Sequence, residues 1–185
     1  AFVAQGARVT LVARNTETLA KARDQLMSEG ASADQVHTES ADMRDANAAL
    51  QALDRAEAQF GPVQVLVNSA GAAQRVPVDD LTPQAWHDAM QAKFFSYVHM
   101  TDPCIKRMGQ RGQGRIVNIA SDAARVGSSG EVVYAACKGG LVSFSKTIAR
   151  DPARHGITVN VVCPGPTDTA LFADYKEGAG NPDKL

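Results

Sequence analysis

Short β-branched runs alternate along this chain with longer amphipathic stretches. The short runs predict strands at residues 8–13, 36–40, 63–68, 115–120 and 157–163. The longer stretches between them predict helices at residues 16–29, 45–60, 83–108 and 132–155. Thr82 and Pro83 suit the N-cap and the first residue of the third of these helices.

This order of elements predicts the fold class. Strands that alternate with helices form right-handed crossovers, which build a parallel sheet with helices on both faces. Several of the strand runs are almost continuously apolar, which is typical of strands buried on both faces. We therefore expect residues 1–185 to form a single domain of the α/β class, with a doubly wound parallel sheet of the Rossmann type. In such folds ligands bind beyond the carboxyl ends of the strands.

Composition excludes several kinds of partner. Of the 185 residues, 44% are hydrophobic and 21% charged, which is typical of a globular domain, and the formal net charge is −1. Because there is no broad positive field, neither nucleic acid nor a membrane is an expected partner, and no apolar run is long enough to span a bilayer. The three cysteines form no Cys-x-x-Cys pair, so we expect no metal site and a reduced, cytoplasmic location.

Candidate chemistry is concentrated between residues 121 and 138. Tyr134 and Lys138 are four residues apart on a predicted helix, so both side chains project from one face. An ammonium group favours the charged form of a neighbouring phenol, which makes Tyr134 a candidate proton donor or acceptor. Ser121 follows a predicted strand, and its hydroxyl could hold a substrate oxygen beside that phenol.

These residues, with the Asn68-Ser69-Ala70-Gly71 turn and the Pro164-Gly165 pair, occur in the order found in short-chain dehydrogenases/reductases. The chain resembles this family over essentially its whole length, and residues 122–171 are most similar to the 2-hydroxycyclohexanecarboxyl-CoA dehydrogenase type. The resemblance implies that Tyr134 is the acid/base and that Ser121 positions the reacting oxygen. It also implies that Lys138 both modulates the phenol and binds the nicotinamide ribose.

The resemblance implies a nicotinamide cofactor held by three groups of residues. Asp42 would recognise the adenine with Met43 beside it, although a simple turn or N-cap role for Asp42 is the alternative. The turn with Asn68, Ala70 and Gly71 would lie along the adenine side of the cofactor. The loop after the last predicted strand would embrace the nicotinamide carboxamide and the phosphates through Pro164, Gly165, Thr167 and Thr169.

Arg14 decides which nicotinamide cofactor we expect. An acidic residue at the end of strand 8–13 would bind the ribose hydroxyls of NAD and repel a 2′-phosphate, but Ala13 and Arg14 stand there. A guanidinium can pair with that phosphate, so the sequence predicts NADP(H) and makes NAD(H) the less favoured cofactor. An ordinary surface arginine is the alternative interpretation.

Two departures from the family pattern bear on these expectations. Residues 1–6 read as the end of a helix that closes on a Gly C-cap, and the first family strand with its Gly-rich turn is missing before Ala1. The last family strand is missing after Leu185, so we interpret the sequence as a fragment whose sheet lacks a strand between 8–13 and 63–68. The second departure is Lys93, which replaces the usual asparagine. It either points inward, where it would lower the pKa of Lys138, or extends outward to solvent.

The sequence thus favours an NADP(H)-dependent oxidoreductase that interconverts a secondary alcohol and a ketone. A narrower option is a hydroxyacyl-CoA dehydrogenase, and the alternative from another class is a non-catalytic binding or scaffolding subunit. The resemblance also implies a homotetramer or homodimer built through the two long helices. Their apolar residues, including Phe94, Phe95 and Tyr97, are expected in the core and in subunit contacts.

Overall fold

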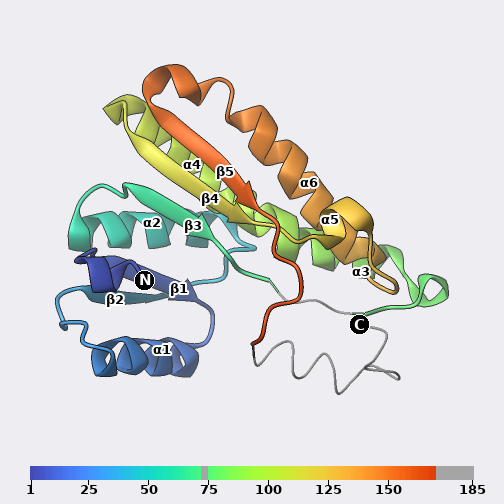
Figure 1. Ribbon diagram of the computed structural model, residues 1–185, viewed down its shortest axis with the longest axis horizontal. Coiled ribbons are helices and arrows are strands. Elements are labelled where there is room, and N and C mark those ends of the chain that lie inside the picture. Colours follow the sequence, from blue (N-terminus) through green and yellow to red (C-terminus); the bar gives the residue numbers. More distant parts are fainter. Residues whose placement is uncertain (72–74, 170–185) are drawn as a thin grey trace.

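The computed structural model describes residues 1–71 and 75–169, and its strands and helices alternate along the chain (Figure 1). The strands are β1 (Val9–Ala13), β2 (Val36–Ser40), β3 (Val65–Asn68), β4 (Gly114–Ile119) and β5 (Ile157–Val162). The helices are α1 (Thr16–Ser28), α2 (Ala46–Phe60), α3 (Pro83–Met90), α4 (Ser96–Arg111), α5 (Ala123–Val126) and α6 (Val132–Ile148). The predicted α/β class with parallel sheets is confirmed.

The first three long helices begin where polar side chains cap their free amides. Asn15 accepts a hydrogen bond from the amide of Thr18, and Asp45 accepts one from the amide of Asn47. Thr82 accepts from the amide of Ala85, with Pro83 as the first helical residue, as the sequence predicted. Each of these starts is therefore encoded by a residue that precedes the helix.

The strands form two parallel sheets. In the first, β1 pairs with β2 from Val9–Val36 to Ala13–Ser40, and in the second β4 lies between β3 and β5. Within the described residues no strand pairing joins β1 to β3, and Val65 and Val67 of β3 are exposed. The family resemblance implies a further strand between β1 and β3, and that strand stays a prediction.

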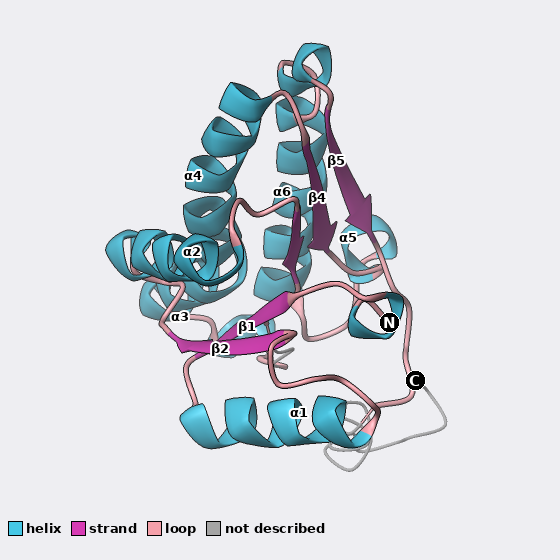
Figure 2. Cartoon of the chain, turned by 90° about the vertical axis from the view of Figure 1, so that its left-hand side faces the viewer, coloured by secondary structure: helices cyan, strands magenta, loops and turns pink. Residues whose placement is uncertain are grey.

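The helices cover the two sheets unequally. The β1–β2 pair lies between α1 on one side and α2 on the other (Figures 1 and 2). The buried residues Ile116 and Ile157 of the second sheet share a core with Met100 and Met108 of α4. The alternate residues Arg115 and Thr158 are exposed. The expectation that the strands are buried on both faces is thus wrong for β4 and β5, because in the described residues helices pack against one face of that sheet only.

The predicted helix 83–108 is interrupted by a π-helical turn, Gln91–Phe95, before α4 continues to Arg111. The ring of Phe94 packs against α6 so closely that a Cβ on Gly140 would lie 3.3 Å from its Cε2 atom. The helix predicted over 132–155 also differs, because α6 ends at Ile148. Pro152, which lacks a backbone N–H, starts a separate 3₁₀ turn at Pro152–His155.

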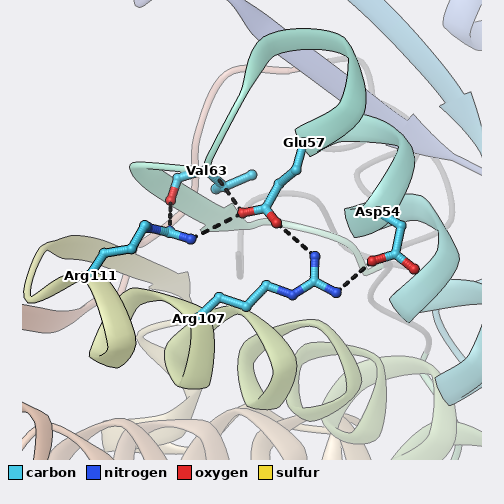
Figure 3. A network of polar contacts seen from close by, with 5 residues as sticks. All are labelled: Asp54, Glu57, Val63, Arg107 and Arg111. Carbon is cyan, nitrogen blue, oxygen red and sulfur yellow. Dashed lines mark hydrogen bonds and ion pairs between the residues drawn. The ribbon is translucent and has the colours of Figure 1, made fainter.

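An ion-pair network joins α2, α4 and the approach to β3 (Figure 3). Arg107 donates to Glu57 at 2.7 Å and also to Asp54, while Arg111 donates to the carbonyl of Val63 at 2.7 Å. Glu57 in turn accepts from the amide of Val63 at 3.0 Å. Although burial opposes ionisation, this amide and the two guanidinium groups hold the pKa of Glu57 below its usual value. The network thus ties the segment that leads into β3 to both α2 and α4.

Candidate active site

A cleft of about 1520 Å³ runs along the gap between the two sheets and past the carboxyl ends of β1, β2 and β3. It brings together seven of the residues that the sequence predicted for the site, namely Arg14, Asp42, Met43, Asn68, Ala70, Gly71 and Tyr134. The lining runs the whole length of β1 and β3, whose facing edges are unpaired, and the strand that the family resemblance implies would occupy that part of the cleft. The other predicted residues lie outside its lining, namely Ser121, Lys138, Pro164, Gly165, Thr167 and Thr169.

Tyr134 and Lys138 are held one helical turn apart on α6. Tyr134 is half-buried, and its ring centroid lies 5.8 Å from the Lys138 ammonium nitrogen. Lys138 is only 4% exposed, and its Nζ donates to the carbonyl of Ile119 at 2.7 Å and to Tyr97 Oη at 3.1 Å. A Cβ on Gly71 would lie 3.8 Å from this Nζ. The ammonium therefore lies just behind the Gly71 turn, between the phenol and the end of β4.

The charge of Lys138 is set by its surroundings. Burial lowers the pKa of Lys138 to about 8, the thiols of Cys137 and Cys163 oppose this change, and the positive charge of Lys93 adds to it. Lys93 lines the cleft, so of the two orientations left open by the sequence the structure shows the inward one. In the described ranges the side chain of Lys93 makes no hydrogen bond or ion pair.

Ser121 lies two residues after the end of β4 and is held by its neighbours on both sides. Its Oγ accepts from the amide of Ala123 at 3.2 Å, and the adjacent amide of Asp122 donates to the carbonyl of Pro164 at 2.8 Å. The α5 turn that follows packs on α6, where a Cβ on Gly139 would lie 3.8 Å from the carbonyl oxygen of Ala124. Ser121 is thus anchored between the helix of Tyr134 and the loop after β5.

The side chain of Asn68 faces the protein interior. Its amide nitrogen donates to Thr101 Oγ1 at 2.9 Å and to Asn118 Oδ1 at 2.8 Å, and Asn118 donates onward to Ser145 Oγ at 2.9 Å. Both amide hydrogens of Asn68 are used in this buried ladder. Asn68 therefore fixes the position of the Ser69-Ala70-Gly71 turn, and only its backbone and its oxygen are left for a ligand.

Exposed charges surround the other end of the cleft. Arg14 is exposed, and its carbonyl accepts from Ser40 Oγ at 3.0 Å. Asp42 is engaged by the side chain of Arg44, whose Nε donates to both carboxylate oxygens at 3.0 and 2.9 Å. The hydrogen bonds from Arg44 lower the pKa of Asp42 to about 2, with a smaller contribution from Arg14. The carbonyl of Met43 lies 3.0 Å from His99 Nδ1.

The loop after β5 carries the last group of predicted residues. Thr167 Oγ1 donates to the carbonyl of Gly165 at 3.0 Å, and Thr169 Oγ1 donates to the carbonyl of Thr167 at 3.3 Å. Through the bond from Asp122 to Pro164, this loop is joined to the segment that carries Ser121. It therefore borders the candidate site, although it does not line the cleft.

Sequence reasoning missed two residues that act on this site. Tyr97 is buried in the core as predicted, but its hydrogen bond to Lys138 was not predicted. Arg44, which binds Asp42, was not singled out. The spacing of Tyr97 four residues after Lys93 is a signal for the first, because it suggests a shared helix face. In residues 1–71 and 75–169 no group of three or more His, Cys, Asp or Glu side chains could hold a metal ion.

With this geometry established, comparison with known proteins is decisive: residues 1–180 match the short chain dehydrogenase family. The chain belongs to this family. A short chain dehydrogenase similar to it is the acetoacetyl-CoA reductase of Rhizobium meliloti (strain 1021), 37% identical over 136 residues, which are 74% of this chain and 56% of that protein. The chain thus spans about half the length of that relative. In the described part of this short chain dehydrogenase, no helix combines the length and apolar character needed for a bilayer span.

Two solved structures show the same fold. A variant of actinorhodin polyketide ketoreductase, determined with NADPH, has a TM-score of 0.90 and 32% identity, covering 95% of this chain and 67% of that one. Gluconate 5-dehydrogenase from Burkholderia cenocepacia J2315, determined with NADP and tartrate, has a TM-score of 0.80 and 28% identity, covering 94% of this chain and 70% of that one.

Proposed function

We propose that this short chain dehydrogenase is an NADP(H)-dependent oxidoreductase that interconverts a secondary alcohol and a ketone. The observation that carries the proposal is the arrangement of Tyr134 and the buried Lys138 on α6, with the Lys138 ammonium 5.8 Å from the Tyr134 ring. Tyr134 supplies the proton donor that this reaction requires, and Arg14 would select NADP(H) by pairing with its 2′-phosphate.

The residues at the Tyr134 end perform the proton chemistry. When bound, NADPH supplies a hydride to the carbonyl carbon of the substrate. Tyr134 Oη donates a proton to the carbonyl oxygen, which completes the alcohol, and in the reverse direction the same phenolate removes that proton. Ser121 Oγ holds the reacting oxygen by a hydrogen bond. Lys138 stabilises the phenolate by its positive charge and directs its remaining N–H toward the cofactor ribose.

The residues that line the cleft suit a dinucleotide. Ala70 and Gly71 present little side-chain bulk at the turn above Lys138, which allows close approach of a ligand. Arg14 is exposed at the end of β1, where it can pair with a 2′-phosphate. The two similar structures determined with NADPH and NADP support the choice of cofactor. Asp42 would have to share its carboxylate between Arg44 and the adenine amine.

For the substrate, we propose a 3-oxoacyl thioester as the first candidate. The similarity to an acetoacetyl-CoA reductase supports it, whereas the similarity to gluconate 5-dehydrogenase supports a sugar acid. The test is a panel of keto acyl thioesters, cyclic ketones and keto sugar acids, with NADPH oxidation followed by absorbance. Oxidation with a thioester and none with the other classes is the expected result.

The same panel separates the enzyme from a non-catalytic binding subunit. Tyr134→Phe keeps the shape of the side chain and removes its ionisable hydroxyl, so turnover should fall by about 100-fold or more while NADPH binding is retained. Binding of NADPH without turnover of any substrate by the wild type would instead favour the binding subunit.

We also propose that α4 and α6 form the contact of a homodimer or homotetramer, which light scattering tests.

A further inference from the structure

The Lys138 ammonium rests on a second tyrosine, which belongs to another helix. Tyr97 lies in the first turns of α4 and is only 1% exposed. Its Oη accepts from Lys138 Nζ at 3.1 Å and donates to the carbonyl of Ile119 at 3.1 Å, and the same carbonyl accepts from Nζ at 2.7 Å. The phenol, the ammonium and the last carbonyl of β4 thus form a closed triangle.

This triangle limits what Lys138 can offer to a ligand. An ammonium has three N–H donors, and two of them are directed to Ile119 and Tyr97. The Ile119 carbonyl has two lone pairs, so it can accept from both Nζ and Tyr97 Oη. One N–H of Lys138 is left over, and the turn at Gly71 lies next to it.

Tyr97 remains a neutral phenol in this position. Burial raises the pKa of Tyr97, and the neighbouring Tyr134 raises it further. Its oxygen therefore keeps its proton for Ile119 while a lone pair faces the ammonium. The Tyr97 ring centroid is 4.9 Å from Nζ, so the ammonium lies beside the hydroxyl edge of the ring.

The position of Tyr97 is fixed independently of Lys138. Tyr97 is the second residue after the π-helical turn Gln91–Phe95. The residue between them, Ser96, is bound to that turn, because its Oγ donates to the carbonyl of Ala92 at 2.8 Å. Phe94, within that turn, packs edge-on against Phe144 of α6 with ring centroids 5.9 Å apart. The turn thereby sets the register of α4 against α6 and brings the Tyr97 hydroxyl under the ammonium.

From this geometry we infer that Tyr97 is a positioning residue for Lys138. It holds the ammonium between β4 and the Gly71 turn, stabilises its charged form, and leaves one N–H for a ligand in the cleft. The consequence for catalysis rests on the function proposed above, whereas the effect on the charge of Lys138 does not. The charged and titratable groups that face Lys138 are Tyr97 from α4, Lys93 from the π turn, Tyr134 and Cys137 from α6, and Cys163 after β5.

The test is an NMR titration of Lys138 in protein whose lysines carry ¹³C at Cε. The signal of Lys138 is identified because it is absent from the spectrum of Lys138→Met. Tyr97→Phe keeps the ring and removes only the hydroxyl. Losing one hydrogen bond to a charged group should lower the Lys138 midpoint by about one pH unit from the wild-type value. Thr147→Val is the control, because it removes a hydroxyl that donates to the carbonyl of Ser143 nine residues beyond Lys138 on α6, and it should leave the midpoint unchanged.

A variant with 3-fluorotyrosine at position 97 preserves the size and the hydroxyl but makes the oxygen a weaker acceptor, so it covers the case in which Tyr97→Phe does not fold. It should lower the midpoint by a smaller amount. An unchanged midpoint in both variants, or an equal change in Thr147→Val, overturns the inference.

The second readout is the pH dependence of turnover. The part of the pH–rate profile that reports the ionisation of Lys138 should shift by the same amount as the NMR midpoint. If the midpoint moves in Tyr97→Phe while the wild type reduces no substrate, the proposed function fails and the positioning role stands. If the wild type is active and the midpoint does not move, the positioning role fails alone.

Discussion

The two ends of the cleft are built on different physical principles. At the Tyr134 end, Lys138, Asn68 and Asn118 are buried, and each polar group is held by hydrogen bonds within the fold. At the Arg14 end, the arginine is exposed and the Asp42–Arg44 pair lies at the surface. Burial strengthens electrostatic interactions, whereas exposed charges are screened by water and salt. The reacting end is therefore rigid and tuned by desolvation, and the nucleotide-selecting end is adjustable by single charges.

The largest effect on activity should come from Lys138→Met, which removes the buried ammonium. We expect turnover to fall by about 100-fold or more and NADPH affinity by about 10-fold, because both the phenolate and the ligand lose a charged partner. Steady-state rates and fluorescence titration with NADPH measure the two effects. Lys146→Met on the exposed face of α6 is the control and should change neither. Equal losses in both variants would contradict the assigned role of Lys138.

At the opposite end, Arg14→Asp should reverse the preference between the two cofactors. The ratio of kcat/KM for NADPH to that for NADH should fall by about 10- to 100-fold, the loss expected when a charge-assisted hydrogen bond is replaced by repulsion. Arg23→Asp makes the same charge change on the exposed face of α1, outside the cleft, and should leave the ratio unaltered. The contribution of Arg14 should also weaken as salt is added, unlike that of Lys138. An NADH preference in the wild type would refute the cofactor assignment.

The Glu57 network differs from both ends of the cleft, because it stabilises the segment that leads into β3 and takes no part in the reaction. Glu57→Gln should lower the free energy of unfolding by about 1 to 2 kcal/mol at neutral pH, since the side chain is largely buried between two arginines. Because the pKa of Glu57 is lowered in the folded state, this stabilisation is present above its usual value of 4.5 and is lost as pH falls through the lower folded value.

Urea unfolding of Glu57→Gln and wild type across a pH series checks this sign. The difference between their free energies of unfolding should become smaller as the pH is lowered. Asp102→Asn, which breaks an exposed pair with Lys106, is the control and should have little effect at any pH. A difference that grows toward acid pH would show that the carboxylate does not act through its charge.

The smallest effect should come from Lys93→Asn, which removes a positive charge near Lys138. The pKa of Lys138 should then rise from about 8, and the matching limb of the pH–rate profile should move to higher pH, with only a few-fold change in the maximal rate. Lys146→Asn removes a positive charge from an exposed position on the same helix as Lys138 and should leave the profile in place. A profile that Lys93→Asn does not change would remove Lys93 from the mechanism.

Local signals in the sequence predicted the parts of this molecule that depend on local structure. The β-branched runs gave the strands, Asp45 and Thr82 predicted helix starts, and the spacing of Tyr134 and Lys138 predicted their common face. The π-helical turn was not predictable in this way, because it depends on Phe94 packing against Gly140 of another helix. The Tyr97 contact was missed for the same reason, since it requires α4, β4 and α6 to be placed together. The exposed face of the second sheet was missed because an apolar run carries no information about which helices cover it.

The most direct test of the account is a crystal structure of the protein with NADPH and an unreactive analogue of a ketone substrate. The account predicts that Tyr134 Oη and Ser121 Oγ both lie within hydrogen-bonding distance of the analogue's oxygen, about 2.6 to 3.2 Å. It also predicts that the free N–H of Lys138 points to the ribose and that Arg14 contacts the 2′-phosphate. A nucleotide bound elsewhere, or a Tyr134 hydroxyl turned away from that oxygen, would contradict it.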